Sequence, residues 1–450
     1  FAANPAFRAA EWSELTTPGN PYRRPVRPDD LKWVKYDKPM TAERSLRLSA
    51  LLGHRMLRNI YDHRVSLVPP VVDGAVLGDR AEFYATRARI NAELARPVLE
   101  RHLFAFLDED APEGVSADID AAIDAVAATA QEIATGRLRT AVAAERLTGR
   151  REAAVYVLVQ YHGMIPAVRE ALGRAGIGEF PAHADAVQSL LLDSYRDWVG
   201  ARSPYRELLS AAGLSQTPGA QWQLVLGTSL GRGNHLLSLA DDGSRLAELL
   251  GAAVLLAVSG PTDTAQIREV VAAGLPGVTL DGIDLGLGVS AEQYSVTELA
   301  RTVIQALVAS FGTDAVSGFR RGFAHAARFR ELWDADLATQ IAWADQIELH
   351  KDYAEKIAAY LDDNQIVVDL DTFVESEEET STTHVHNEHR LVMIEKGQMH
   401  FWNNVTHKIE LETGDKILIP ISRLHGSTVL SGECTYHQPI IPDELLQKII

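Results

Sequence analysis

The sequence has 450 residues, which is too long for one hydrophobic core and predicts two or three domains. Its hydrophobic content of 46% is that of a soluble globular protein, no apolar stretch approaches the length of a membrane span, and the net charge of −18 argues against binding to nucleic acid or anionic lipid. The single cysteine, Cys434, excludes a disulfide within the chain, so we expect a reducing, cytoplasmic location.

The first part of the chain, residues 1–112, begins with an Arg- and Pro-rich segment and continues with helical patterns. Apolar residues recur at helical spacing over Ala42–Arg64, and the pattern continues over Asp79–Leu107. The sequence APEG at Ala111–Gly114 is typical of a break between elements. We therefore predict a helical N-terminal domain over residues 1–112.

The second part, residues 113–345, is rich in Ala, Leu and Glu and predicts a bundle of at least seven helices. Its most apolar segment, Leu246–Val258, is short and indicates a buried helix. The expected helices are Ala117–Arg139, Glu152–Gly173, Ala184–Val199, Gln221–Leu239, Arg245–Val258, Thr262–Ala273, Ala291–Phe311 and Val316–Trp333.

The third part, residues 346–450, starts with a helix over Asp352–Leu361 and then changes to short strands. A polar loop is expected over Glu375–Thr383. The spacing of the strands, roughly 8–12 residues, predicts a sandwich or barrel. The expected strands are Ile366–Val374, Arg390–Glu395, Gln398–Trp402, His407–Leu411, Lys416–Pro420, Gly426–Leu430 and Glu433–His437.

Three histidines in this third part form an ordered pattern. His384 and His386 are separated by one residue, so on a strand both imidazoles point to the same face. A turn glycine, a Gly-Asp turn and a proline follow, and His425 stands five residues after that proline. This order is typical of a cupin jelly roll, in which the three histidines converge inside the mouth of the barrel.

Three neutral imidazoles suit Fe, Zn, Cu or Ni. Such a site leaves up to about three positions open on an octahedral ion, which is room for substrate and O₂ together. This favours redox-active Fe(II), one per chain, over structural zinc. The alternative is a cupin shell without metal, because two histidines one residue apart are by themselves a weak signal.

Two further residues are candidates for a catalytic role. Many cupins have a glutamate a few residues after the paired histidines, and Arg390 occupies that place here. An arginine directed toward the site would bind a carboxylate in a bidentate manner. The alternative is an ion pair with Glu388 or Glu412 at the rim. Tyr436 and His437 alternate on the last strand, so one of them faces inward, and Tyr436 is a candidate donor beside the metal ligands.

Several stretches of the chain resemble the N-nitrosourea-forming metalloenzyme family of streptozotocin biosynthesis. They are NPYRRPVRP near the start, YDK at Tyr36–Lys38, FAFLDED at Phe104–Asp110, QIAWAD at Gln340–Asp345, THVH at Thr383–His386, RLHG at Arg423–Gly426 and ECTY at Glu433–Tyr436. The resemblance spans nearly the full length and is specific at both ends. It implies a multidomain α plus β protein with a helical dimerisation domain, a haem-oxygenase-like diiron bundle and a C-terminal cupin β-barrel.

In that family, the diiron bundle hydroxylates guanidine nitrogens of a methylated arginine, and the cupin iron then forms the N–N bond by oxidative rearrangement. The cupin ligands of the family map onto His384, His386 and His425, whereas its nearby acidic residue maps onto Arg390. The resemblance therefore implies Fe(II), O₂ as co-substrate, an amino-acid-derived small-molecule substrate and a homodimer.

The bundle departs from the family at the positions where the diiron ligands should stand. The expected glutamates fall near Val168, Ser194 and Ala257, and an expected histidine falls near Gly200–Arg202. The His- and Asp-rich ligand helix corresponds to Asp281–Ser290, which contains no histidine. We therefore expect no diiron centre and a helical bundle that serves as a scaffold.

Three hypotheses of function follow. In the first, the cupin forms an N–N bond on a substrate that a separate N-hydroxylase supplies, or on a different amine or hydroxylamine. In the second, it is a cupin dioxygenase of a small amino or thiol acid. In the third, the chain is a non-catalytic scaffold or partner of an active homologue.

Overall fold

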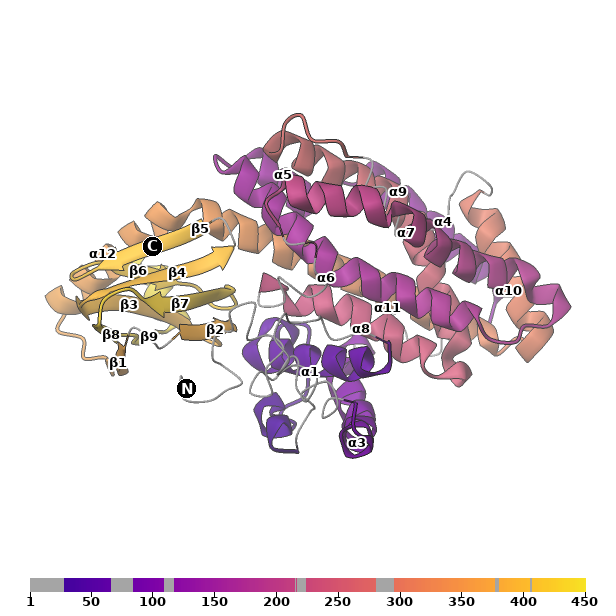
Figure 1. Cartoon of the computed structure of the whole chain (residues 1–450), viewed down its shortest axis with the longest axis horizontal. Helices are drawn as coiled ribbons and strands as arrows, with labels where there is room; N and C mark the ends of the chain where they lie inside the picture. The colour runs from indigo at the N-terminus through magenta and orange to yellow at the C-terminus, as the bar shows by residue number, and fades with distance from the viewer. Residues whose placement is uncertain are drawn as a thin grey trace.

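The computed structural model of the protein describes residues 28–65, 84–108, 117–214, 216, 224–280, 295–376, 380–404 and 407–450. Within these ranges, helices occupy the chain up to Asp363, and strands dominate from Thr372 onward. Figure 1 shows the strands as a body at the left and the long helices as a bundle at the right. This is the predicted order of a helical part followed by a cupin-like β part.

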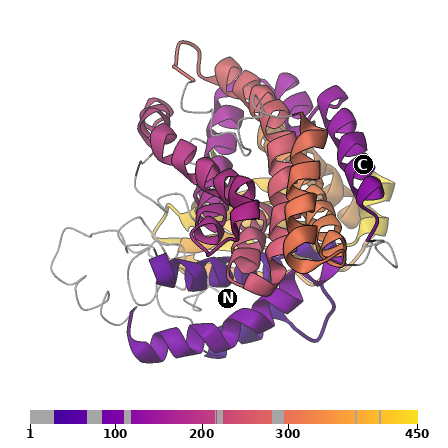
Figure 2. The ribbon, with the colours of Figure 1, turned by 90° about the vertical axis from the view of Figure 1, so that its right-hand side faces the viewer.

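The N-terminal helices are α1 (Leu48–Val65) and α3 (Thr86–Leu103), and they lie beneath the bundle in Figures 1 and 2. Two short 3₁₀ helices, Pro28–Val34 and Arg44–Leu46, precede α1. Apolar side chains of α1 and α3 belong to the same buried core as those of the bundle. The predicted helices are therefore present, while the predicted boundary at residue 112 lies outside the described residues.

The bundle is built around α9, which packs extensively against both α6 and α11. Its helices are α4 (Ile119–Thr135), α5 (Arg139–Glu145), α6 (Arg150–Gly176), α7 (Asp185–Ala211), α8 (Gly227–Ala240), α9 (Leu246–Gly274), α10 (Val296–Phe311) and α11 (Ala315–Asp345). A further helix, α12 (Ile347–Asp363), leads into the barrel.

Helix α9 is longer than the sequence predicts, because two expected helices form one. Pro261 lies inside this helix and is exposed. Most of the surrounding residues are buried against the bundle, and this burial stabilises the helix more than the missing backbone hydrogen bond of the proline destabilises it. The uninterrupted helix is long and apolar enough to cross a membrane, contrary to our expectation. However, 72% of its most apolar segment is buried inside the protein, which is typical of a core helix.

Two glycines allow α9 and α11 to approach closely. A Cβ atom on Gly251 would lie 1.9 Å from the carbonyl oxygen of Phe319, and one on Gly322 would lie 1.8 Å from that of Glu248. Both distances are far below van der Waals contact, so no side chain fits at either position.

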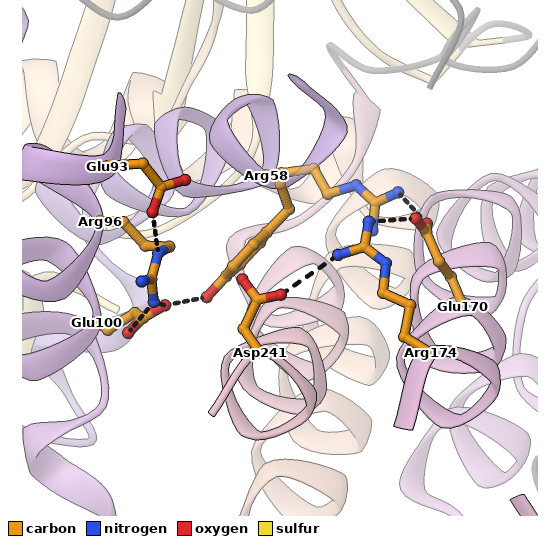
Figure 3. Close-up of polar contacts among 8 residues, drawn as sticks. Arg58, Glu93, Arg96, Glu100, Glu170, Arg174 and Asp241 are labelled. Atoms are coloured by element: carbon orange, nitrogen blue, oxygen red, sulfur yellow. Dashed lines mark hydrogen bonds and ion pairs between the residues drawn. The ribbon is translucent and has the colours of Figure 1, made fainter. Parts of the chain in front are cut away.

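Ion pairs connect α1 to the bundle (Figure 3). Arg58 of α1 lies 3.8 Å from Glu170 of α6, which also pairs with Arg174 at 2.5 Å. Arg174 in turn lies 3.5 Å from Asp241, at the end of α8. These side chains are largely buried, so the pairs fix the position of α1 relative to α6 and α8 more than they add net stability.

The strands form two facing antiparallel sheets, as in a cupin-like jelly roll. One sheet has the order β1-β8-β3-β6 with β9 paired to β3, and the other has the order β2-β7-β4-β5. The strands are β1 (Thr372–Ser376), β2 (Thr380–His384), β3 (His389–Lys396), β4 (Gln398–Asn404), β5 (His407–Glu412), β6 (Lys416–Ile419), β7 (His425–Val429), β8 (Glu433–His437) and β9 (Ile440–Ile441).

The predicted polar loop over Glu375–Thr383 is wrong at both ends. Glu375 and Ser376 belong to β1, and Thr380–His384 form β2, which pairs with β7. Threonine favours strands through its branched Cβ, and this signal was hidden by the polarity of the segment. The first strand also begins at Thr372 instead of Ile366, and a C-terminal helix, α13 (Asp443–Ile449), was not predicted.

Helices cover the barrel from two sides. Trp343 and Ile347, at the junction of α11 and α12, pack with the inward-facing residues of the sheets, such as Val392 and Phe401. On the outer face of β3, Leu391 packs against α12. The barrel is therefore held directly against the helical part.

Candidate metal centre

The structure brings the three predicted histidines together. His384 is the last residue of β2, and it pairs in register with His425, the first residue of β7. His386 follows β2 by two residues. One ligand nitrogen from each imidazole lies within 4.8 Å of the other two, and the Nε2 atoms of His384 and His386 are 3.2 Å apart. Two nitrogens each about 2.1 Å from one ion lie about 3 Å apart, so this spacing suits a shared metal ion.

Alternation along the backbone produces this convergence. Val385, between the two histidines, and Leu424, next to His425, point away from the imidazoles and belong to the buried core of the helical part. Each ligand segment therefore has an imidazole on its inner face and an apolar side chain on its outer face.

Hydrogen bonding selects the nitrogen that His425 offers. Its Nδ1 lies 2.9 Å from the carbonyl oxygen of Arg423 and donates to it, so the lone pair of the neutral ring is on Nε2. That Nε2 is buried and has no hydrogen-bond partner among the described residues. A buried nitrogen without a partner is costly, and a metal ion would satisfy it.

Burial keeps the imidazoles neutral. Desolvation, with a smaller contribution from His384, lowers the pKa of His425 to about 3. Desolvation and the neighbouring His425, His384 and Arg390 also lower the pKa of His386 well below its usual value. Neutral imidazole is the form that binds metal, so the site is ready for a metal ion at neutral pH.

Aromatic rings surround His425 and limit the access of water. The ring of Phe401 lies 5.8 Å from that of His425, and Trp343 of α11 lies at 6.5 Å. His384 and His425 are buried, whereas His386 is only partly buried. The open side of the triad is therefore the side of His386.

Arg390 lies on β3, in phase with the inward-facing Val392 and Ile394. Its Nη1 donates to Asp371 at 2.6 Å and to the carbonyl oxygen of Gln438 at 2.7 Å. The Nη2 atom of Arg390 lies 3.9 Å from Oε2 of Glu388. Arg390 thus has an ion-pair partner, Asp371, that the sequence did not suggest.

Tyr436 faces the barrel interior and is 4% exposed, whereas its neighbour His437 bonds to Thr372. The ring of Tyr436 stacks on Phe373 at 5.4 Å. Tyr436 belongs to the sheet opposite the one that carries His384 and His425. Its predicted role beside the ligands remains a prediction.

The bundle has a buried cation where the resemblance places metal ligands. Val168, Ser194 and Ala257 are all buried, and Arg169 donates through Nη1 to the carbonyl oxygen of Ser194 at 2.8 Å and to its hydroxyl. Gly200–Arg202 lie on α7. The segment Asp281–Ser290 lies outside the described residues. A guanidinium at this position disfavours the binding of a second cation.

Sequence reasoning missed two residues that contact the ligand segments, Arg55 of α1 and Gln340 of α11. Both are distant in sequence from the histidines, so no local pattern links them. The only signal was the stretch QIAWAD, which contains Gln340 and Trp343 and was noted for its resemblance alone.

No family model matches the chain. A protein named nitrosourea synthase, from Streptomyces achromogenes subsp. streptozoticus, is 26% identical over 97% of this chain and 93% of its own length. The similarity thus covers both the helical part and the barrel that carries the histidine triad. The chain is therefore similar over nearly its full length to a protein named for nitrosourea synthesis.

Proposed function

We propose that the protein is a cupin-type mononuclear iron enzyme that forms an N–N bond in natural-product biosynthesis. The observation that carries the proposal is the convergence of His384, His386 and His425 on one point inside the barrel. The full-length similarity to a nitrosourea synthase supports the reaction class, an N-nitroso or related product.

The donor set favours iron. Three neutral imidazoles satisfy Fe(II) and leave positions open on the side of His386, which is only partly buried. Iron bound there would supply the open positions and the redox chemistry for an oxidative rearrangement with O₂. Trp343 and Phe401 pack around His425 and exclude water from the inner side of the site.

Arg390 is the residue we assign to substrate binding. Asp371 and the carbonyl oxygen of Gln438 hold its Nη1, so the guanidinium is fixed in place. Its Nε is buried and has no hydrogen-bond partner among the described residues, which leaves this donor for the carboxylate of an amino-acid-derived substrate. Tyr436 remains a candidate hydroxyl donor from the opposite sheet.

The helical bundle is assigned a scaffolding role. The buried contact between Arg169 and Ser194 occupies the place of an expected metal ligand. The substrate would then reach the cupin already N-hydroxylated by a separate enzyme. We also propose that the chain forms a homodimer through its N-terminal helices.

Metal counting tests the proposal directly. The apo protein is loaded with Fe(II) without oxygen, and the metal per chain is measured for wild type and His425→Ala. We expect about one iron per chain, lost in the variant. About three irons per chain would contradict the scaffold role of the bundle, and no iron would refute the enzymatic proposal.

Product analysis then separates the reaction classes. The iron-loaded protein is incubated with candidate hydroxylamines and hydroxyguanidines in the presence of O₂, and the products are analysed by mass spectrometry. N–N-bonded products are expected. Oxygenated amino or thiol acids without an N–N bond would instead identify a cupin dioxygenase.

A further inference from the structure

We propose that Arg55 and Gln340, two side chains of the helical part, position the metal-ligand segments of the barrel. The inference rests on the proposed metal site and adds to it two positioning residues. It also gives the helical part a specific role, which is to hold the two segments that carry the histidines.

Arg55 of α1 holds the segment that carries the first two histidines. It is completely buried, and its Nη1 donates to the carbonyl oxygen of Thr383 at 2.8 Å while its Nη2 donates to the Thr383 hydroxyl at 3.0 Å. Thr383 directly precedes His384. One bond to the backbone and one to the side chain of the same residue fix both its position and its orientation.

Gln340 of α11 holds the turn before the third histidine. Its Nε2 donates to the carbonyl oxygen of Ser422 at 2.7 Å, and its Oε1 accepts from the backbone N–H of Leu424 at 3.0 Å. Nε2 also donates to Asp336 at 3.0 Å. Because Oε1 faces an N–H donor and Nε2 faces two acceptors, only one orientation of the amide satisfies all three contacts.

The turn itself adopts a strained conformation that needs such support. Ser422 has a φ of 61°, in the left-handed region that costs a non-glycine residue about 1 kcal/mol. Its N–H donates to the carbonyl oxygen of His386 at 3.0 Å, and its hydroxyl accepts from Arg47, the residue before α1, at 3.1 Å. The turn therefore joins the two ligand segments and is held by Arg47, just before α1, and by Gln340 of α11.

Apolar contacts also hold the ligand segments against the helical part. Val385 is 5% exposed and Leu424 is fully buried, and both pack in the core of the helical part. Removing a polar contact from Arg55 or Gln340 would therefore loosen the outer face of a ligand segment while its imidazole stays in the barrel. Loss of the supporting contacts of metal ligands typically lowers metal affinity about 10–100-fold.

Two matched controls exist in the bundle. Arg169 donates to the carbonyl oxygen and hydroxyl of Ser194, which repeats the contact of Arg55 with Thr383. Gln160 donates to the carbonyl oxygen of Leu224 at 2.8 Å and accepts from the N–H of Leu226 at 2.9 Å, which repeats the contact of Gln340. Neither control contacts the barrel through these bonds.

The experiment compares Arg55→Met and Gln340→Met with Arg169→Met and Gln160→Met in the full-length protein. Co(II) affinity is measured by titration of its visible absorption bands. Hydrogen–deuterium exchange of residues 380–386 and 420–426 is measured without metal. We expect the first pair to bind Co(II) about 10-fold more weakly and to exchange faster in these two segments, whereas the controls only lower the unfolding midpoint.

The inference is overturned if Arg55→Met and Gln340→Met keep the Co(II) affinity and the exchange protection of wild type. It is also overturned if the two control variants lose affinity and protection to the same extent. Should Arg55→Met fail to fold, Arg55→Lys, which keeps one donor, replaces it and is expected to show an intermediate affinity. If wild type itself binds no Co(II) or Fe(II), the proposed function fails, while the exchange measurement still decides whether Arg55 and Gln340 hold the two segments.

Discussion

His425 in the barrel and two buried arginines in the bundle have different surroundings. In the barrel, the Nε2 of His425 is buried without a hydrogen-bond partner among the described residues, and it faces two other imidazoles. In the bundle, the guanidinium of Arg330 forms three hydrogen bonds to the carboxylate of Asp263, and that of Arg169 is bound to Ser194. The lone pairs of the imidazoles converge and need a ligand, whereas these two guanidinium groups are bound within the bundle. Arg232 of the bundle is also buried without a hydrogen-bond partner for Nη1 or Nη2 among the described residues, but its guanidinium lies over the ring of Trp333.

This difference explains how one chain can combine a metal site with a scaffold. A metal site requires neutral, converging lone pairs that no protein donor occupies. A structural core requires that each buried charge has a partner, since an unpaired one is expensive. Substitutions in the two regions should therefore affect different measured quantities.

The largest effect is expected for His384→Ala. Removing one of three ligands should weaken metal binding by at least about 100-fold, more than the loss of a supporting contact. The metal-free protein should stay folded and lose about 1 kcal/mol of stability, because His384 loses its contacts with the rings of His386 and His425. Equilibrium dialysis with Fe(II) and thermal unfolding of the metal-free protein measure the two quantities. An unchanged affinity would remove the distinction between barrel and bundle.

Asp263→Asn should give the converse result. It leaves Arg330 largely buried without its carboxylate partner, and we expect a loss of about 3–5 kcal/mol in the free energy of unfolding. Metal affinity of the folded protein should stay at the wild-type value. Urea unfolding measures the stability, and metal titration measures the affinity. Combining Asp263→Asn with Arg330→Met should recover part of the lost stability, because the unpaired charge is removed. A loss of metal affinity would show that the two regions are not separable in this way.

Gly322→Ala probes the contact between α9 and α11. The added Cβ would overlap the carbonyl oxygen of Glu248, so we expect a loss of about 3 kcal/mol in unfolding free energy. Gly200→Ala is the control, because its Cβ would meet no atom within 4 Å and alanine favours helices by about 1 kcal/mol. Chemical denaturation of both variants tests the prediction, and similar effects at the two positions would contradict it.

The smallest effect concerns acid stability of the helical part. Burial lowers the pKa of His54 to about 3, below the value of about 6.5 expected when the chain is unfolded. Between these two values the unfolded chain binds the extra proton, so stability is full above pH 6.5 and falls as the pH decreases toward 3. Because of this shift, the free energy of unfolding should be about 2 kcal/mol lower at pH 5 than at pH 8. Urea unfolding at both pH values should show a smaller change in unfolding free energy for His54→Leu than for wild type. Equal changes in the two proteins would contradict the prediction.

Local patterns in the sequence predicted much of the fold. Most helices of the bundle and the strands from β3 to β8 were predicted because their apolar periodicity is local, whereas the short helix α5 was not predicted. The errors lie where tertiary contacts decide. Pro261 does not end α9, because packing against α6 and α11 keeps the helix continuous. The polar residues Thr380–His384 form a strand, because β7 lies beside them.

For the site, the sequence by itself determined which histidines converge. His384 and His386 share a face through strand alternation, and the spacing to His425 matches a known barrel pattern. Only the tertiary structure decided what surrounds them. Arg55 contacts Thr383 across 328 residues and Gln340 contacts Ser422 across 82, and Asp371 pairs with Arg390 from a neighbouring segment. Such contacts depend on how α1, α11 and the sheets pack together, and no periodicity within one element encodes that arrangement.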